Sequence, residues 1–200
     1  MSERSLWPAA VVLAAGASTR MGRPKLALPV RGTPILRRVA QAATASRCRE
    51  VVVVLGGTHA AVYRPLLDGL PVRVVENPDP AEGMGSSIRV GVAAVSPEAS
   101  GVVILLGDQP LVTAEMIDHL IETAVAGGHR IVASTARGVV GPPAYFDRAL
   151  FLELLTLEGD RGARSVIERY PTQGVAVPLP DEAAADVDTA DDLSGLGERP

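Results

Sequence analysis

The segment from Ala9 to Lys25 reads Ala-Ala-Val-Val-Leu-Ala-Ala-Gly-Ala-Ser-Thr-Arg-Met-Gly-Arg-Pro-Lys. Its apolar start runs from Ala9 to Ala15 without alternating polar residues, which is typical of a strand buried on both faces of a parallel sheet. Small residues, glycines and basic side chains follow at once. Because open parallel sheets bind ligands at the carboxyl ends of their strands, this transition predicts a binding site after Ala15.

Similar apolar runs recur along the chain and predict further buried strands: Val51 to Leu55, Val72 to Val75, Val102 to Leu106 and Ile131 to Ser134. Helical patterns lie between them. We expect one helix to start at Thr33 as N-cap with Pro34 in the first turn, and another to follow Thr113 over Ala114 to Ala126. The alternation of strands and helices predicts an α/β fold with a three-layer, doubly wound, mostly parallel sheet.

The pattern changes after about residue 138. We expect a Pro-Pro turn, a helix near Asp147 to Leu155, a second helix from Asp160 to Glu168, and a late strand at Val175 to Val177. No linker rich in Gly, Ser or Pro separates two halves, and no internal repeat is present. Residues 1–200 are therefore predicted to form a single domain.

Composition and net charge argue against some classes of function. The chain has 200 residues, 47% of them hydrophobic and only 3% aromatic, with a net charge of −4. An acidic chain with few aromatic side chains is a poor candidate for binding nucleic acid or an anionic membrane, so we expect neither partner. The single cysteine, Cys48, excludes an intrachain disulfide and suits a reducing compartment, so we expect a cytoplasmic protein.

The first loop predicts a phosphate site. Its glycines and small residues allow backbone N–H groups to approach phosphate oxygens, and Arg20, Arg23 and Lys25 supply positive charge. The spacing fits neither a Walker A loop nor a dinucleotide fingerprint. A glycine turn with solvated basic residues remains the structural alternative.

Two further strand ends carry candidates. Asp108 follows the run that ends at Leu106 and could hold a hard cation such as Mg²⁺, although a turn aspartate would look the same. Asp186 and Asp188 lie on one side of an extended segment, and Thr189 then suits an N-cap. Ser86 and Ser87 stand at a helix start, where capping and ligand contact are equally good interpretations.

Several motifs together resemble the molybdenum-cofactor cytidylyl- and guanylyltransferases of the MobA/MocA-like NTP transferase family. Those motifs are Leu13 to Lys25, Asn77-Pro78, Gly83 to Gly91, Leu106 to Pro110, Gly141 to Pro143, Gly159 to Arg164 and Asp186 to Leu193. Two positions depart from the family pattern, with Pro142 in place of a histidine and Ala190 in place of a proline.

The resemblance implies a nucleotidyltransferase that moves CMP from CTP to the terminal phosphate of molybdopterin, with a molybdoenzyme or its chaperone as a further partner. It implies that Lys25, Arg20 and Asp108 are catalytic and that Asp108 and Asp188 hold Mg²⁺. The implied nucleotide-binding residues are Leu13, Ala14, Ala15, Gly16, Ser18, Arg20, Gly22, Lys25, Ser86, Ser87 and Asp108.

Other functions stay open at this point. The nucleotide donor could be GTP, or the acceptor another phosphorylated small molecule. The chain could also be a noncatalytic molybdopterin carrier or chaperone, or a reductase of a nicotine-derived pigment. The residues give no support to a dinucleotide site, because Gly83-Met-Gly-Ser-Ser-Ile lacks the third glycine of that fingerprint.

Overall fold

The computed structural model describes residues 7–16, 21–183, 186–189, 192–193 and 196. A seven-stranded sheet has the order β5-β4-β1-β6-β8-β7-β9. Its strands are β1 (Pro8–Ala14), β4 (Glu50–Gly56), β5 (Arg73–Asn77), β6 (Gly101–Leu106), β7 (Ile131–Ala136), β8 (Val139–Asp147) and β9 (Gly174–Pro178). A small hairpin pairs β2 (Pro29–Val30) with β3 (Thr33–Pro34).

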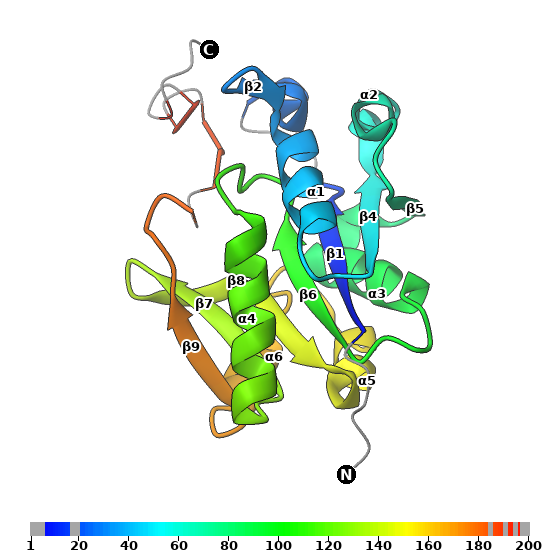
Figure 1. Cartoon of the computed structure of the whole chain (residues 1–200). Coiled ribbons are helices and arrows are strands. Elements are labelled where there is room, and N and C mark those ends of the chain that lie inside the picture. The colour runs from blue at the N-terminus through cyan, green and yellow to red at the C-terminus, as the bar shows by residue number, and fades with distance from the viewer. Residues whose placement is uncertain (1–6, 17–20, 184–185, 190–191, 194–195, 197–200) are drawn as a thin grey trace.

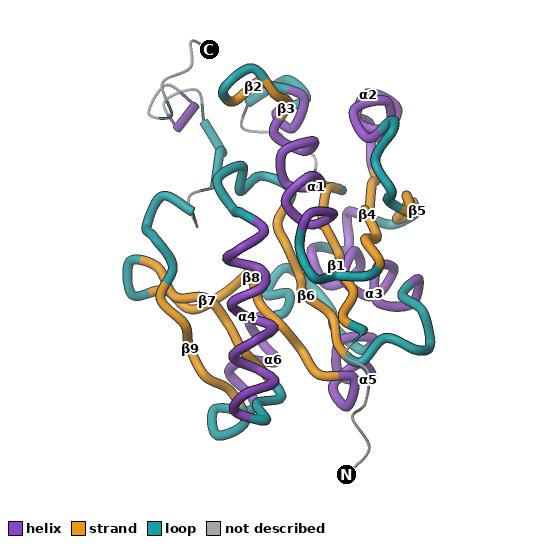
Figure 2. The backbone as a smooth tube through the Cα atoms, in the orientation of Figure 1, coloured by secondary structure: helices purple, strands orange, loops and turns teal. Residues whose placement is uncertain are grey.

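Helices cover both faces of this sheet (Figures 1 and 2). The helices are α1 (Ile35–Ala45), α2 (Ala60–Tyr63), α3 (Met84–Ala94), α4 (Ala114–Gly127), α5 (Phe151–Leu155) and α6 (Arg164–Arg169). One buried cluster unites α1 and α4 with one face of the sheet, and a second unites α3, α5 and α6 with the other. The predicted three-layer α/β fold is confirmed.

Strand β1 shows why the apolar run contains no polar residues. It pairs in parallel with β4 on one side and β6 on the other, so that Val11 lies beside both Val52 and Ile104. Its residues alternate between the two clusters, with Val12 in the first and Val11 in the second. Every residue of the strand is buried, because both faces are covered by helices.

Helix α3 lies unusually close to this strand. A Cβ atom on Gly91 would be 2.4 Å from Val11 Cγ1 and 2.9 Å from Val54 Cγ2. Since real Cβ atoms do not approach other atoms this closely, only glycine allows α3 to pack at this depth. This packing fixes the position of α3, whose N-terminal residues Met84 and Ser87 line a cavity at the end of β1.

Several local predictions are wrong. Thr33 is in β3 and provides no side-chain cap, and α1 follows Pro34 directly, because the β2–β3 hairpin already fixes the chain entering the helix. The expected Pro-Pro turn is strand β8, which contains Pro142 and Pro143. The helix expected from Asp160 begins at Arg164, after a turn with a left-handed Gly162.

Other local predictions are confirmed. The Thr113 side chain accepts a hydrogen bond from the backbone N–H of Met116 at the start of α4, and Gly128 ends that helix in the left-handed conformation. The late strand is present as β9. In the described part of the chain, no helix has the length and apolar character needed to cross a bilayer.

Candidate active site

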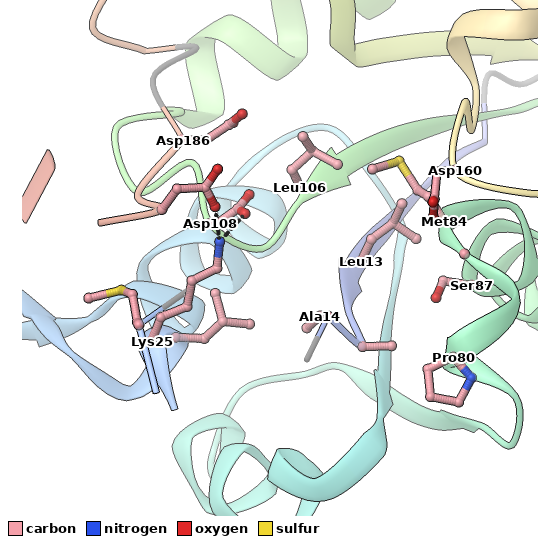
Figure 3. A pocket seen from close by; sticks show the side chains of 16 residues that line it. Leu13, Ala14, Lys25, Pro80, Met84, Ser87, Leu106, Asp108, Asp160 and Asp186 are labelled. Atoms are coloured by element: carbon pink, nitrogen blue, oxygen red, sulfur yellow. Dashed lines mark hydrogen bonds and ion pairs between the residues drawn. The ribbon is translucent and has the colours of Figure 1, made fainter. Parts of the chain in front are cut away.

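A first cavity of about 480 Å³ opens at the carboxyl ends of β1 and β6 (Figure 3). The described residues that line it are Leu13, Ala14, Ala15, Gly16, Met21, Lys25, Leu26, Pro80, Gly83, Met84, Ser87, Leu106, Asp108, Asp160, Asp186 and Asp188. These residues come from opposite ends of the sequence and meet because adjacent parallel strands end at the same edge of a sheet.

Lys25 joins the two carboxylates that we expect to hold a metal. Its Nζ lies 2.7 Å from Asp108 Oδ2 and 2.7 Å from Asp188 Oδ1 (Figure 3). Burial alone would lower the pKa of Lys25, but the charges and hydrogen bonds of the two carboxylates raise it overall. The ammonium group is therefore charged at neutral pH and faces the cavity.

The backbone places these three side chains. Lys25 opens a short 3-10 turn, and Asp108 stands one residue after Gly107, whose N–H donates to Leu13 O at 2.8 Å. A Cβ on Gly107 would lie 2.7 Å from that same oxygen, so glycine is required for the close approach. The N–H of Val187 donates to Asp108 O at 3.0 Å and brings the side chain of the next residue, Asp188, to the end of β6.

Asp186 is a site residue that our sequence prediction left without a role. It lines the first cavity together with Asp188, while Val187 between them is buried. Burial and the nearby charge of Asp108 raise the pKa of Asp186 to about 6, and a hydrogen bond from Gln109 opposes this increase. Gln109 Nε2 donates to Asp186 Oδ1 at 3.0 Å. The signal in the sequence that could have indicated a role for Asp186 is its spacing of two residues from Asp188, which places both side chains on one side of an extended segment.

The two serines differ in position. Ser87 lines the first cavity, whereas Ser86 does not. Both serine hydroxyls accept hydrogen bonds from Asn77 Nδ2, and the single hydroxyl proton of Ser86 is within reach of two backbone oxygens, Asp79 O at 3.0 Å and Gly83 O at 2.8 Å. Asn77, at the end of β5, thus ties the start of α3 to the sheet.

The start of α3 also packs against the loop before α6. Gly83 has φ of +97°, and a Cβ there would lie 2.5 Å from Asp160 Oδ1. The N–H of Gly85 donates to Gly159 O at 2.9 Å. The glycines of this motif therefore allow contact between two segments of protein, and they bring Asp160 to the cavity wall.

The remaining predicted residues are distributed as follows. Leu13, Ala14, Ala15, Gly16, Lys25, Ser87, Asp108 and Asp188 line the first cavity. Gly22 adopts φ of +62° in the loop but is not among the described lining residues. Ser18 and Arg20 lie outside the described residues.

The charges in the first cavity suit a divalent cation. Its described lining includes four carboxylates, those of Asp108, Asp160, Asp186 and Asp188, against the one ammonium of Lys25. No group of three His, Cys, Asp or Glu side chains in the described part is arranged to hold a metal by itself. Mg²⁺ commonly uses one or two carboxylates together with phosphate oxygens, so Asp108 and Asp188 fit this ion.

A second cavity of about 510 Å³ adjoins the first and shares Met84, Leu106, Asp160 and Asp186 with it. Its other lining residues are Gln109, Ser134, Ala136, Arg137, Val139, Val140, Gly141, Pro142, Arg161, Ala163, Arg164, Glu168 and Asp181. They belong mainly to β7, β8 and α6. The two cavities could therefore hold two ligands side by side.

Comparison with known proteins identifies relatives over most of the chain. The chain is 36% identical over 174 residues to the purine catabolism protein PucB of Bacillus subtilis, covering 82% of each. It is 34% identical over 197 residues to nicotine blue oxidoreductase of Paenarthrobacter nicotinovorans, covering 93% of this chain and 94% of that one.

Solved structures also resemble this chain over most of its length. Rv0371c of Mycobacterium tuberculosis has a TM-score of 0.81 and 34% identity, covering 96% of this chain and 97% of that one. A nucleotidyl transferase from Methanothermobacter, Mth528, has a TM-score of 0.79 and 25% identity, with 95% of each chain covered. Because residues 10–175 also match the MobA-like NTP transferase domain, the chain belongs to the MobA-like NTP transferase family.

Proposed function

We propose that this protein transfers CMP from CTP to the terminal phosphate of molybdopterin and releases pyrophosphate. The observation that carries the proposal is the Lys25 ammonium, held at 2.7 Å from both Asp108 and Asp188 beside the end of β1 in a member of this family. Such an arrangement suits a reaction that depends on neutralising phosphate charge. We also propose that the protein is cytoplasmic and that residues 1–200 form a single domain.

The reaction needs no covalent intermediate on the protein. An oxygen of the acceptor phosphate attacks the α-phosphorus of the nucleotide, a new phosphoanhydride bond forms, and the bond to the β-phosphate breaks as pyrophosphate leaves. The acceptor phosphate is already ionised near neutral pH, so no general base is required. Positioning of the reacting groups and stabilisation of negative charge account for the catalysis.

Lys25 would stabilise negative charge on the α-phosphate. Its ammonium is held by Asp108 and Asp188 at the wall of the cavity that the nucleotide would enter. Ala14 and Ala15, both small and buried, let the nucleotide approach the backbone closely. Arg20 would contact the leaving pyrophosphate.

Asp108 and Asp188 would hold the Mg²⁺, which, when bound, supplies charge neutralisation to the triphosphate. The two carboxylates come from segments 80 residues apart and meet through the hydrogen bond from Val187 N–H to Asp108 O. A similar solved structure is an Rv0371c complex with manganese, with a TM-score of 0.77, 33% identity, and coverage of 96% of this chain and 97% of that one. A divalent cation is thus a reasonable expectation for this site.

Nucleotide choice tests the cytidylyl part of the proposal. A pocket that satisfies a pyrimidine edge leaves polar groups unpaired when a purine enters, so we expect CTP to bind about a hundredfold more tightly than GTP. The lining that would select is the backbone at Ala14 and Ala15 together with Ser87, whereas Ser86, expected from the sequence to take part, does not line the cavity. Titration calorimetry with both triphosphates and Mg²⁺ measures the ratio. Equal binding, or tighter GTP binding, contradicts CTP as the donor.

Turnover tests the reaction itself. We expect pyrophosphate release and a CMP-labelled pterin when the protein is incubated with CTP, Mg²⁺ and reduced molybdopterin. Release with GTP, or only with another phosphorylated acceptor, would identify a different transferase. Molybdopterin binding without pyrophosphate would indicate a carrier or chaperone.

The relative named nicotine blue oxidoreductase makes a pigment reductase worth including in this assay. NADPH oxidation in the presence of the pigment, without pyrophosphate release, would favour that function. The motif from Gly83 to Ile88, which lacks the third glycine of a dinucleotide fingerprint, gives no support to that function.

A further inference from the structure

The second cavity has more cationic side chains than the first, although four carboxylates also line it, those of Asp160, Asp181, Asp186 and Glu168. Its described lining contains three guanidinium groups, those of Arg137, Arg161 and Arg164. Arg161 forms an ion pair with Glu168. Asp181 accepts the backbone N–H of Arg137, and Asp186 accepts from Gln109. Most acidic groups of this cavity therefore already have partners.

Arg164 is different from Arg161. Its guanidinium has no carboxylate within 4 Å in the described part of the chain, and its Nε donates to Val140 O at 3.3 Å. This bond connects the side chain from α6 to strand β8, across the cavity wall. The side chain is exposed, and the rest of its guanidinium can bind an anionic group of a ligand in the cavity.

Gln109 gives an independent indication of a ligand. Its side chain is only 3% exposed and lines the second cavity. Its Oε1 is buried and has no hydrogen-bond partner in the described part, while its Nε2 donates to Asp186. Because buried polar atoms rarely stay unpaired, an unpaired carbonyl oxygen here indicates a site completed by something outside the chain.

The junction between the cavities is formed by Leu106, Met84, Asp160 and Asp186, which line both. Figure 3 shows Met84 and Asp160 on the side of the first cavity away from Lys25, Leu106 between them and Asp108, and Asp186 on the side of Asp108. A ligand in the second cavity would thus meet a nucleotide in the first at this junction. It would reach the α-phosphate from outside the Lys25 cluster.

We infer that the second cavity is the acceptor site and that Arg164 is its specificity-determining residue, which selects a phosphorylated acceptor carrying a second anionic group. This inference rests on the proposed function and adds the chemical class of the acceptor. The reacting phosphate lies at the junction, and the second anion lies against Arg164. The acceptor's hydrogen-bond donors face Gln109.

A matched pair of probes tests this selection. 3-Phosphoglycerate and glycerol 3-phosphate differ in one group, a carboxylate in the first and an alcohol in the second. We expect wild-type protein to bind 3-phosphoglycerate about tenfold more tightly, which is the usual effect of one hydrogen bond to a charged group. Titration calorimetry measures both affinities, with and without Mg²⁺ and an α,β-methylene analogue of CTP.

Three variants locate the effect. Arg164→Gln should abolish the tenfold preference, and Arg164→Lys should retain part of it because the charge remains. Arg169→Gln is the matched control on the same helix, since Arg169 pairs with Glu153 and lines neither cavity. We expect it to retain the full preference. Circular dichroism and the nucleotide affinity report whether each variant is folded.

The outcomes separate the two proposals. Equal affinity for both probes in the wild type, no binding of either, or a preference that survives Arg164→Gln would overturn the role of Arg164. Absence of CTP-analogue binding and of pyrophosphate release would instead overturn the proposed function. In that case, a preference for 3-phosphoglycerate that is measured without nucleotide and lost in Arg164→Gln would still support the role of Arg164.

Discussion

The two ends of the sheet differ in strand direction and in packing. In the parallel half, β5, β4, β1 and β6 all run in the same direction. In the mixed half, β8 is antiparallel to both β6 and β7, while β9 is parallel to β7. The first cavity adjoins the parallel half and the second adjoins the mixed half, so the same difference separates the two candidate ligand sites.

Two glycines show a local difference in packing between the halves. A Cβ on Gly91 would collide with Val11 and Val54, whereas a Cβ on Gly141, in β8, would meet no atom within 4 Å. Rigid packing holds the charged groups of the first cavity in fixed positions, which charge-stabilising catalysis requires. The open wall of the mixed half can accept different acceptors. We therefore expect substitutions in the parallel half to affect the chemical step, and those in the mixed half to affect acceptor choice.

The largest effect is expected from Asp108→Asn. Loss of one carboxylate ligand of a catalytic metal removes several kcal/mol of transition-state stabilisation, so kcat/KM should fall about a thousandfold while folding is retained. Asp147→Asn, in the mixed half, is the control, because Asp147 caps a short helical turn through the N–H of Ala149 and lines neither cavity. Steady-state pyrophosphate release compares the two. Wild-type turnover by Asp108→Asn would remove Asp108 from the mechanism.

Lys25→Ala should have the next largest effect. The Lys25 ammonium contacts both carboxylates of the first cavity, and removing a charge aimed at the α-phosphate commonly costs about a hundredfold or more in kcat. Arg23→Ala, two residues earlier, removes the same charge from a residue that does not line the cavity. Equal losses of kcat/KM in both variants would mean that the loop supplies only a general positive field.

A pair of glycine substitutions tests the packing difference directly. Gly91→Ala forces α3 away from Val11 and Val54 and should reduce the free energy of unfolding by about 1–3 kcal/mol. Gly141→Ala, in the mixed half, meets open space and should change it by less than about 0.5 kcal/mol. Urea denaturation measures both. Similar losses would show that the two halves do not differ in packing.

The smallest effect concerns alkaline pH. Burial raises the pKa of Cys48, before β4, from 9.0 to about 12, and burial together with Asp147 raises the pKa of Tyr145, in β8, from 10.0 to about 12. A raised pKa means that the folded state keeps a proton which the unfolded state releases. Stability is therefore fully present below about pH 9 and declines as the pH rises toward 12.

Cys48 begins to lose this stability one pH unit before Tyr145. At pH 10, Cys48→Ala should therefore remove about 1 kcal/mol of the alkaline decline, and Tyr145→Phe should remove less. Urea denaturation at pH 8 and pH 10 measures the difference for each protein. An unchanged decline in Cys48→Ala would show that the thiol does not contribute to it.

The mixed half was the harder one to predict. Residues 139–147 contain two prolines and a burial pattern that changes from exposed to buried, so they lack the continuous apolar run of β1. We predicted a turn there, and the strand forms because β6 and β7 pair with it from both sides. A register shift between Ala133 and Ser134 accommodates the prolines. These pairings join residues distant in sequence.

The site residues likewise divide into those that the sequence could predict and those that it could not. Lys25, Asp108 and Asp188 could be singled out because each stands in a motif of its own, and two of them adjoin strand ends. Asp186 and Gln109 could not be assigned a role, because their importance comes from a hydrogen bond between segments 77 residues apart. The same holds for Arg164, an exposed arginine that is distinguished from the others only by its hydrogen bond to Val140 in β8 and its place on the second cavity.

The sequence by itself determined the buried strands and most helix positions, since these depend on apolar periodicity and on residues close together in the chain. The tertiary structure alone decided that Lys25 lies between Asp108 and Asp188, that Asp186 lines two cavities, and that β8 is antiparallel. Such features arise from long-range pairing, in which the free energy of burying whole faces of the sheet overrides local preference.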